Sequence, residues 1–235
     1  MLFTRLLRQI PSLCAVCRSW GTQALCTACV ERFASPGPRC ERCALQVPQG
    51  VRICGACLVD PPAFDGAVAG VDYAHPWSAL ITQFKFHAML DLGEALSSLL
   101  RSAQERAASP VPQLLLPVPL STQRLRERGF NQAWELTRRV ARALHAEADA
   151  HLLLRVRDTP HQLALPPEQR AANVRGAFAV EPLRRAELAG RSVAVIDDVL
   201  TTGATFAEVA RVLKQAGASR VEAWALARTP RPGLG

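Results

Sequence analysis

From about residue 61 onward, short apolar runs alternate along the chain with longer segments of helical spacing. Residues 113–119 (QLLLPVP) and 193–196 (VAVI) are too short for helices and are typical of strands buried on both faces of a parallel sheet. A polar loop follows each run, and then an amphipathic stretch, AWELTRRVARAL in the first case and FAEVARVLKQAGA in the second. This pattern predicts an α/β fold in which helices flank a parallel sheet.

The intervening segments carry weaker signals. Residues 64–74 are expected to be extended, and their glycines suggest a hairpin. Residues 76–106 are helical in pattern, with a break near Asp91, and Lys85 falls on or near the polar face of this segment. Residues 155–175 lack periodicity and contain several prolines, which predicts a mobile loop.

Eight cysteines occupy the first quarter of the chain as four C-x-x-C pairs. Eight thiolates supply two closed tetrahedral zinc sites without any histidine. A disulfide framework and iron–sulfur ligation stay open as alternatives, and the spacing does not decide whether consecutive or interleaved pairs share a metal. We expect a zinc module over residues 1–60, folded largely by its metal, and a second domain over residues 61–235. The predicted ligands are Cys14, Cys17, Cys26, Cys29, Cys40, Cys43, Cys54 and Cys57.

Composition changes this picture little. The formal charge of +8 suggests a nucleic-acid partner, but all but two of the 28 basic residues are arginine, a bias typical of coding composition. Two four-thiolate zinc sites would lower the charge from +8 to +4. No apolar run approaches the roughly 20 residues of a membrane span, and Arg5 and Arg8 interrupt the apolar N-terminus, unlike a secretory signal. We therefore expect a cytoplasmic protein without membrane insertion.

Residues 192–205 (SVAVIDDVLTTGAT) carry the most specific chemistry. Two carboxylates, Asp197 and Asp198, follow the apolar run, and a loop of small and hydroxyl residues then leads into a helix. The backbone N–H groups of such a loop bind phosphate together with the helix N-terminus, and Gly203 permits close approach. The carboxylates would accept hydrogen bonds from ligand hydroxyls, so a ribose 5-phosphate fits. A helix start with solvated acids is the alternative.

The loop after residues 113–119 is strongly basic. Arg124, Arg126 and Arg128 precede the sequence GFNQ, and arginines in this position are suited to clamp a pyrophosphate. The alternative is a solvated basic helix end. Both loops follow predicted strands of one parallel sheet, so we expect them at the same carboxyl edge, where ligands bind.

Residues 192–205 resemble the ribose-phosphate signature of the type I phosphoribosyltransferases. PVPL followed by GFNQ, R-D-T-x-x-Q at residues 157–162, and R-x-x-N-V at residues 170–174 resemble, in this order, the ComF family. That family consists of phosphoribosyltransferase-like proteins with an N-terminal zinc-binding segment, associated with DNA uptake in natural transformation. The resemblance extends from about Cys14 to Arg228.

This resemblance implies a type I phosphoribosyltransferase-like sheet that binds phosphoribosyl pyrophosphate with Mg²⁺ near the two aspartates. In that family a flexible loop closes over the substrate, and we assign residues 155–175 to it. An acceptor then displaces pyrophosphate from the ribose. The implied catalytic residues are Arg128, Arg157 and Arg170, and the implied binding residues are Asp197, Asp198, Thr201, Thr202, Gly203, Ala204, Thr205, Asn131, Gln162 and Asn173.

One departure leaves the acceptor unidentified. Some transferases that use purine bases carry an acid where this chain has Thr201, and no carboxylate lies between Asp198 and Glu208. The alternative is a non-catalytic module that senses nucleotides or binds single-stranded DNA, with a DNA-uptake helicase as a candidate partner.

Two expectations concern variants. If the aspartates lie at the exposed end of a strand, replacing both by alanine abolishes ligand binding and leaves the fold intact. If the zinc module leans over the site as a hood that recognises the acceptor, deleting residues 1–60 leaves phosphoribosyl pyrophosphate binding within a few-fold. The arginines available to such a hood are Arg18, Arg32, Arg39, Arg42 and Arg52.

Overall fold

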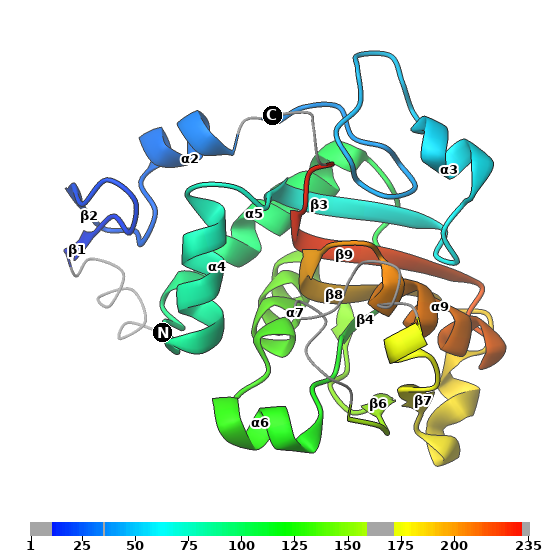
Figure 1. Ribbon diagram of the computed structural model, residues 1–235. Helices are drawn as coiled ribbons and strands as arrows, with labels where there is room; N and C mark the ends of the chain where they lie inside the picture. The colour runs from blue at the N-terminus through cyan, green and yellow to red at the C-terminus, as the bar shows by residue number, and fades with distance from the viewer. Residues whose placement is uncertain (1–10, 35, 159–171, 232–235) are drawn as a thin grey trace.

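The computed structural model describes residues 11–34, 36–158 and 172–231. At its centre lies a five-stranded parallel sheet with the strand order β3-β9-β8-β4-β5 (Figure 1). Because all five strands run in the same direction, their carboxyl ends meet at one edge, where loops from different strands can share a ligand. The strands are β3 (Gly66–Asp72), β4 (Leu114–Pro117), β5 (Glu147–Ala148), β8 (Ser192–Leu200) and β9 (Arg220–Arg228).

Both faces of the sheet are covered, as the continuous apolar runs predict. In β8, Val193 and Val195 belong to the core on one face, and Ala194 and Ile196 belong to the core on the other. Helices α4, α5 and α7 cover the second of these faces, and α9 covers the first (Figure 1). The helices are α4 (Trp77–Phe86), α5 (Leu92–Ala107), α6 (Thr122–Arg128), α7 (Gln132–Leu144), the 3₁₀ helix η3 (Pro182–Leu188) and α9 (Ala204–Gln215).

Residues 64–74 contain a single strand, β3, and the predicted hairpin is wrong. β3 runs parallel to β9, with Gly66 opposite Glu222. A Cβ atom at Gly70 would lie 2.9 Å from the Leu226 carbonyl oxygen and 3.2 Å from the Leu100 nitrogen. Gly70 therefore allows helix α5 to pack closely against the sheet, so this glycine marks helix–sheet packing where the sequence suggested a turn.

A short antiparallel pair of strands, β6 (Leu153–Arg155) and β7 (Phe178–Val180), lies beside the sheet and brackets the predicted mobile loop. Residues 159–171 of that loop lie outside the described residues, and with them Gln162 and Arg170. The pair brings Arg155 opposite Phe178, at the base of the loop.

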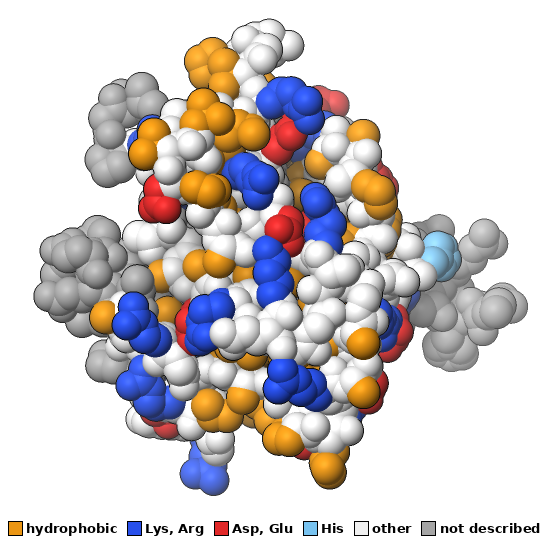
Figure 2. Space-filling view, turned by 90° about the vertical axis from the view of Figure 1, so that its right-hand side faces the viewer, with side chains coloured by type: hydrophobic (Ala, Val, Ile, Leu, Met, Phe, Trp, Pro, Cys, Tyr) orange, Lys and Arg blue, Asp and Glu red, His pale blue; other side chains and the backbone are white. Residues whose placement is uncertain are grey.

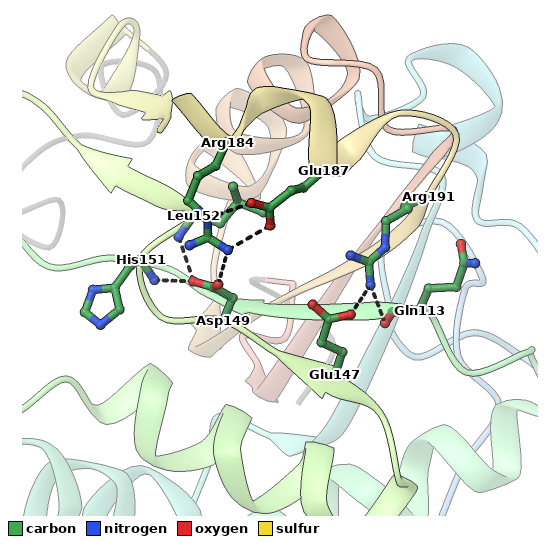
Figure 3. Close-up of polar contacts among 8 residues, drawn as sticks. All are labelled: Gln113, Glu147, Asp149, His151, Leu152, Arg184, Glu187 and Arg191. Atoms are coloured by element: carbon green, nitrogen blue, oxygen red, sulfur yellow. Dashed lines mark hydrogen bonds and ion pairs between the residues drawn. The ribbon is translucent and has the colours of Figure 1, made fainter. Parts of the chain in front are cut away.

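A network of ion pairs anchors this strand pair to the sheet (Figure 3). Arg184 of η3 lies 2.6 Å from the Asp149 carboxylate and 2.8 Å from that of Glu187. Arg191, just before β8, lies 2.5 Å from Glu147 in β5. Each carboxylate in Figure 3 is thus bound by an arginine. We interpret the contacts of Arg184 as scaffold that holds β6 and β7 beside the sheet, and the contact of Arg191 as a link between the start of β8 and β5.

The cysteine-rich region contains two copies of one local structure. The Arg18 N–H donates to the Cys14 carbonyl at 3.0 Å, and the Ala44 N–H donates to the Cys40 carbonyl at 2.8 Å. Arg18 and Ala44 both have positive φ, 63° and 57°. In each copy a short helix begins directly after the third cysteine. The elements of this region are β1 (Ser12–Leu13), β2 (Trp20–Gly21), α2 (Thr27–Phe33) and α3 (Gly55–Val59).

Both copies pack onto the sheet domain. We call residues 11–34 the first ribbon and residues 36–60 the second ribbon. Leu25 of the first ribbon is buried in the same core as helix α4, and the Trp77 indole N–H of α4 donates to the Phe33 carbonyl at 2.8 Å. Ala44 of the second ribbon is buried in the core on the other face. This integration argues against the expectation that residues 1–60 can be removed without loss of structure.

The surface that carries α3 and α9 has no continuous basic patch. Figure 2 shows arginine and lysine side chains interspersed with carboxylates on this face. Two of the contacts here are Arg52 with Glu41 and Lys214 with Asp65, each 2.7 Å long. These two positive charges are therefore paired. Among the residues that the structure describes, every helix is too short or too polar to cross a bilayer.

Candidate functional site

The two predicted aspartates lie inside strand β8. The strand continues to Leu200, so the prediction that it stops at the carboxylates is wrong. Asp197 Oδ1 accepts the Asp198 N–H at 2.8 Å, and Asp198 Oδ1 accepts the Val199 N–H at 3.0 Å. These local bonds fix both side chains. Because Asp198 is only 3% exposed, replacing both aspartates by alanine is not the structurally neutral change expected from the sequence.

Lys85, in the last turn of α4, is the partner of Asp198. Its Nζ lies 2.6 Å from Asp198 Oδ2. This short contact is a charge-assisted ion pair, and it satisfies a carboxylate oxygen that is otherwise buried. Burial alone would raise the pKa of Asp198, but the charges of Lys85 and, to a lesser degree, Arg128 hold this pKa below its ordinary value.

Asp197 shifts in the opposite direction. Limited contact with water first, and the neighbouring charge of Asp198 second, raise the pKa of Asp197 well above its ordinary value. The pair therefore carries one firmly held negative charge and a second that is lost more readily. A cation or a set of hydroxyl donors at this point would stabilise both carboxylates.

The predicted phosphate loop connects β8 to α9 at the carboxyl edge of the sheet. Gly203 is the N-cap of α9 and has φ 87°, a left-handed conformation that favours glycine. It has no side-chain oxygen with which to cap the first turn of this 12-residue helix, so an anion can take that role. The Thr202 hydroxyl accepts the Ala204 N–H at 3.4 Å, and Thr201 and Thr205 on either side are half-buried.

Arg128 lies close enough to the aspartates for their charges to act on it. It is the last residue of α6, so the predicted basic loop is corrected: residues 122–128 form a helix capped by Ser121. The Arg128 guanidinium lies 5.0 Å from the centroid of the Phe86 ring and donates to the Gln132 side chain. Burial lowers the pKa of Arg128, and the charges of Asp198 and Asp197 oppose this shift. The end of α6, which follows β4, and the end of β8 thus share one electrostatic environment.

Asn131 stabilises the short connection between α6 and α7. Its carbonyl oxygen accepts the Ala133 N–H at 2.9 Å and caps helix α7, while its amide donates to the Val118 carbonyl at 3.1 Å. Both ends of the side chain are engaged with the protein. The binding role assigned to Asn131 from the resemblance is therefore better described as positioning the loop.

Arg157 and Asn173 lie at the two ends of the segment that is not described. Arg157 donates to the carbonyl of Asn173 at 3.2 Å and to that of Arg175 at 2.6 Å. In this structure Arg157 ties the ends of the loop together. Arg155, two residues earlier, lies 5.3 Å from the Phe178 ring centroid. Burial lowers the pKa of Arg155, nearby Arg124 lowers it further, and Asp158 and Asp197 oppose both effects.

Sequence reasoning missed two residues of this edge, Lys85 and Arg155. Lys85 carried a signal, because lysine is retained at only two positions in a chain that otherwise uses arginine. Both lysines form ion pairs with carboxylates, Lys85 with Asp198 and Lys214 with Asp65. Arg155 carried no local signal, since its place depends on the pairing of β6 with β7.

The eight cysteines form two clusters from consecutive C-x-x-C pairs. In each cluster the four sulfur atoms lie within 4.8 Å of one another, and all eight cysteines are free. The sulfur–sulfur distances Cys17–Cys26 and Cys43–Cys54 are both 3.7 Å. A tetrahedral zinc with Zn–S bonds of about 2.3 Å requires sulfurs about 3.8 Å apart, so the donor sets fit structural zinc.

Backbone N–H groups assist each cluster. The Cys26 N–H points at Cys14 Sγ (3.4 Å), and the Cys54 N–H points at Cys40 Sγ (3.3 Å). Burial would raise the pKa of Cys14, but hydrogen bonds from backbone groups, that of Cys26 first, lower it to about 6. Burial and the neighbouring thiols raise the pKa of Cys29 in the same cluster to about 12. A bound cation would relieve the repulsion among four thiolates, so the cluster suits metal ligation.

Protein purified without chelator is expected to contain two equivalents of zinc. Because each ribbon supplies a complete and separate donor set, Cys17→Ser and Cys54→Ser should each reduce the content to about one equivalent, and the double variant to none. Metal analysis of the purified proteins measures this. One equivalent in the wild type, or iron in place of zinc, would contradict the assignment.

The carboxyl edge of the sheet, its aspartate–loop–helix arrangement and two stretches of sequence define the class of this protein. Residues 155–233 match the phosphoribosyl transferase domain, and residues 7–58 match the double zinc ribbon domain. The chain is thus a phosphoribosyltransferase-type α/β domain joined to a double zinc ribbon.

Relatives cover almost the whole chain. DNA utilization protein YhgH of Escherichia coli K12 is 35% identical over 228 residues, which cover 94% of this chain and 98% of that protein. Competence protein F of Haemophilus influenzae is 33% identical over 208 residues, 87% of this chain and 90% of that protein. A solved adenine phosphoribosyltransferase of Leishmania tarentolae is a remote likeness, 15% identical with TM-score 0.39 over 70% of this chain and 76% of that one. The chain belongs to the ComF family of phosphoribosyltransferase-like proteins.

Proposed function

We propose that this protein binds phosphoribosyl pyrophosphate at the carboxyl edge of its sheet and transfers the ribose phosphate to an acceptor. The observation that supports this most directly is the neighbourhood of a buried carboxylate and a helix N-terminus. Asp198 lies buried beside the partly exposed Asp197, and Gly203 opens the first turn of α9 only a few residues later. A ligand with hydroxyls next to a phosphate matches this pair of features.

The ligand's parts are assigned to the residues by charge. The 5′ phosphate goes to residues 201–205, and the ribose hydroxyls go to Asp197 and Asp198. The pyrophosphate goes to Arg128 and Arg157, together with Arg170 and Gln162 as the sequence predicts. In the reaction, the bond between the anomeric carbon and the pyrophosphate oxygen breaks, the oxygen keeps the electron pair, and a bond forms from the acceptor to that carbon. The arginines stabilise the charge that develops on the departing group.

Mg²⁺ suits the donor set of this edge, since carboxylate oxygens and phosphates are its preferred ligands. Asp197 and Asp198 would hold it, and the ion would neutralise charge on the pyrophosphate. The Lys85 ammonium group, in its ion pair with Asp198, supplies part of the positive charge at this position. Within the protein, Lys85 keeps Asp198 ionised and oriented before ligand arrives.

A DNA-related role is the second candidate function, without catalysis. The relatives' names, DNA utilization protein and competence protein, favour it. Trp20, on the first ribbon, is 76% exposed. An exposed aromatic ring can stack on an unpaired base. In that case the phosphate site would sense a nucleotide or hold a strand end.

Calorimetry with phosphoribosyl pyrophosphate and Mg²⁺ tests the first candidate, with Gly203→Ala as the informative variant. The wild type is expected to bind, and Gly203→Ala to bind at least ~10-fold more weakly, because alanine strains a residue at φ 87° and shifts the loop. Gly190→Ala is the matched control, since Gly190 also has positive φ (69°) but lies before the start of β8, away from the carboxyl edge.

The pattern of binding separates the two candidates. Equal affinity of the wild type and Gly203→Ala would contradict the phosphate assignment. Absence of wild-type binding, combined with salt-dependent binding of a single-stranded oligonucleotide that weakens in Trp20→Ala, would favour the second candidate. Release of pyrophosphate with any member of a panel of bases would establish transfer.

A further inference from the structure

Arg228 joins the second zinc ribbon to the phosphate loop. It is the last residue of β9 and only 8% exposed. Its Nε donates to the Cys43 carbonyl at 2.8 Å, and Nη1 donates to the Leu200 carbonyl at 2.8 Å and also to the Thr201 carbonyl. One guanidinium therefore contacts a metal-ligand residue and the two residues at the start of the loop.

These contacts orient the peptide groups of the loop. A trans peptide is planar, so its C=O and its N–H point in opposite directions. Arg228 holds the carbonyls of Leu200 and Thr201, and the Thr229 N–H adds a second bond to Leu200 at 3.1 Å. The N–H groups of Thr201 and Thr202 consequently point away from Arg228. Thr202 N–H belongs to the stretch proposed to bind the 5′ phosphate.

The charge of Arg228 is balanced through the same ribbon. Among the described residues, its hydrogen bonds all run to carbonyl oxygens, including that of Thr229 at 3.1 Å. A four-thiolate site that holds zinc carries a net charge of −2, and the carbonyl of one of its ligands, Cys43, is in direct contact with Arg228. The loaded second ribbon thus supplies both an acceptor and a counter-charge to this buried arginine.

The first ribbon meets the domain elsewhere. The Phe33 carbonyl accepts the Trp77 indole N–H at the start of α4, and Leu25 is buried in the core beneath that helix. The two otherwise equivalent metal sites therefore differ in what they support.

We propose that Arg228 is a positioning residue for the phosphate loop and couples ligand binding to the second zinc site, which is formed by Cys40, Cys43, Cys54 and Cys57. Ligand binding is not coupled to the first zinc site, which is formed by Cys14, Cys17, Cys26 and Cys29. This inference rests on the proposed function of the loop. It gives the second ribbon a task within the phosphate site, in addition to any contact with an acceptor. Coupling of this kind is reciprocal, so ligand binding stabilises the second zinc site by the same factor.

The first test compares Arg228→Lys with Arg39→Lys by calorimetry with phosphoribosyl pyrophosphate and Mg²⁺. Lysine keeps the charge but cannot bond Cys43 and both loop carbonyls with one ammonium group. We expect binding at least ~10-fold weaker in Arg228→Lys and within ~2-fold of wild type in Arg39→Lys. Arg39 is a matched control, because its Nη1 docks the same ribbon, on the Ala44 carbonyl and Asp72, without contacting the loop. Both proteins must show two zinc equivalents and a cooperative thermal transition.

The second test needs no variant of Arg228 and follows zinc loss to a chromogenic chelator. Saturating phosphoribosyl pyrophosphate is expected to slow the loss of one zinc equivalent at least ~5-fold and leave the other unchanged. Cys17→Ser, which keeps only the second site, should retain the whole effect, and Cys54→Ser should lack it. Inorganic phosphate is run in parallel as a simple probe of the loop.

The outcomes separate the inference from the function on which it rests. If wild-type protein does not bind phosphoribosyl pyrophosphate, the proposed function fails. The experiment with inorganic phosphate then decides by itself whether the loop and the second zinc site are coupled. If wild type binds but Arg228→Lys binds equally well, or if neither ligand slows zinc loss from the second site, the coupling is overturned. Protection of both zinc sites alike would also overturn it, because general stabilisation would then explain the effect.

Discussion

Asp198→Asn is expected to weaken phosphoribosyl pyrophosphate binding at least ~100-fold and to lower the free energy of unfolding by about 2–4 kcal/mol. The substitution keeps the shape of the side chain and removes its charge. Lys85 then loses the carboxylate that lies 2.6 Å from its Nζ, and the weaker effect of the Asp197 charge compensates only in part. The expected cost is somewhat below that of a fully buried pair, since the Lys85 side chain retains 23% exposure.

Lys85→Met in the Asp198→Asn background separates the two effects. Removing the orphaned charge should restore most of the lost stability, whereas binding should remain absent, because no carboxylate is regained. Asp197→Asn is the matched control: this residue is partly exposed and has a raised pKa, so its replacement should reduce binding with a smaller loss of stability. Denaturant unfolding and calorimetry on the four proteins measure both quantities. Wild-type affinity in Asp198→Asn would contradict the role of this carboxylate.

Deletion of residues 1–60 is expected to give an insoluble or unfolded protein. The deletion removes the acceptor of the Trp77 indole and one of the acceptors of Arg228, and it leaves Asp72 without Arg39. Each buried polar group left without a partner costs about 1–3 kcal/mol. Exposing the apolar surface now covered by ribbon residues such as Leu25 costs about 1.5–3 kcal/mol per large side chain. Together these losses approach the 5–15 kcal/mol that stabilises a typical domain.

Solubility, circular dichroism and thermal melting of the truncated chain check this result against full-length protein made in parallel. Removal of zinc from the full-length protein is the milder version of the same change and should lower its melting temperature. A soluble, cooperatively folded truncation that binds phosphoribosyl pyrophosphate within a few-fold of wild type would contradict the prediction. That outcome would restore the interpretation of the module as an appended hood.

The sequence by itself determined the elements and the chemical groups. Burial on both faces of β8 and β4 follows from runs of apolar residues that need no distant partner to be recognised. Four C-x-x-C pairs define a metal-binding region because their spacing is local. Gly203 between a strand and a helix indicates a phosphate site for the same reason. Local pattern is a sound guide wherever one segment contains the whole feature.

Only the tertiary structure decided how these groups act on one another. The partner of Asp198 is Lys85, which lies on a helix at the other end of the sheet domain's sequence. The pairing of β6 with β7, and the contact of Arg228 with both Cys43 and Thr201, likewise join residues that are distant in the sequence. Such contacts depend on which faces pack together in the folded state. For this reason the sequence indicated two charged segments and a zinc module, and packing brought the second ribbon into contact, through Arg228, with the loop that we propose binds phosphate.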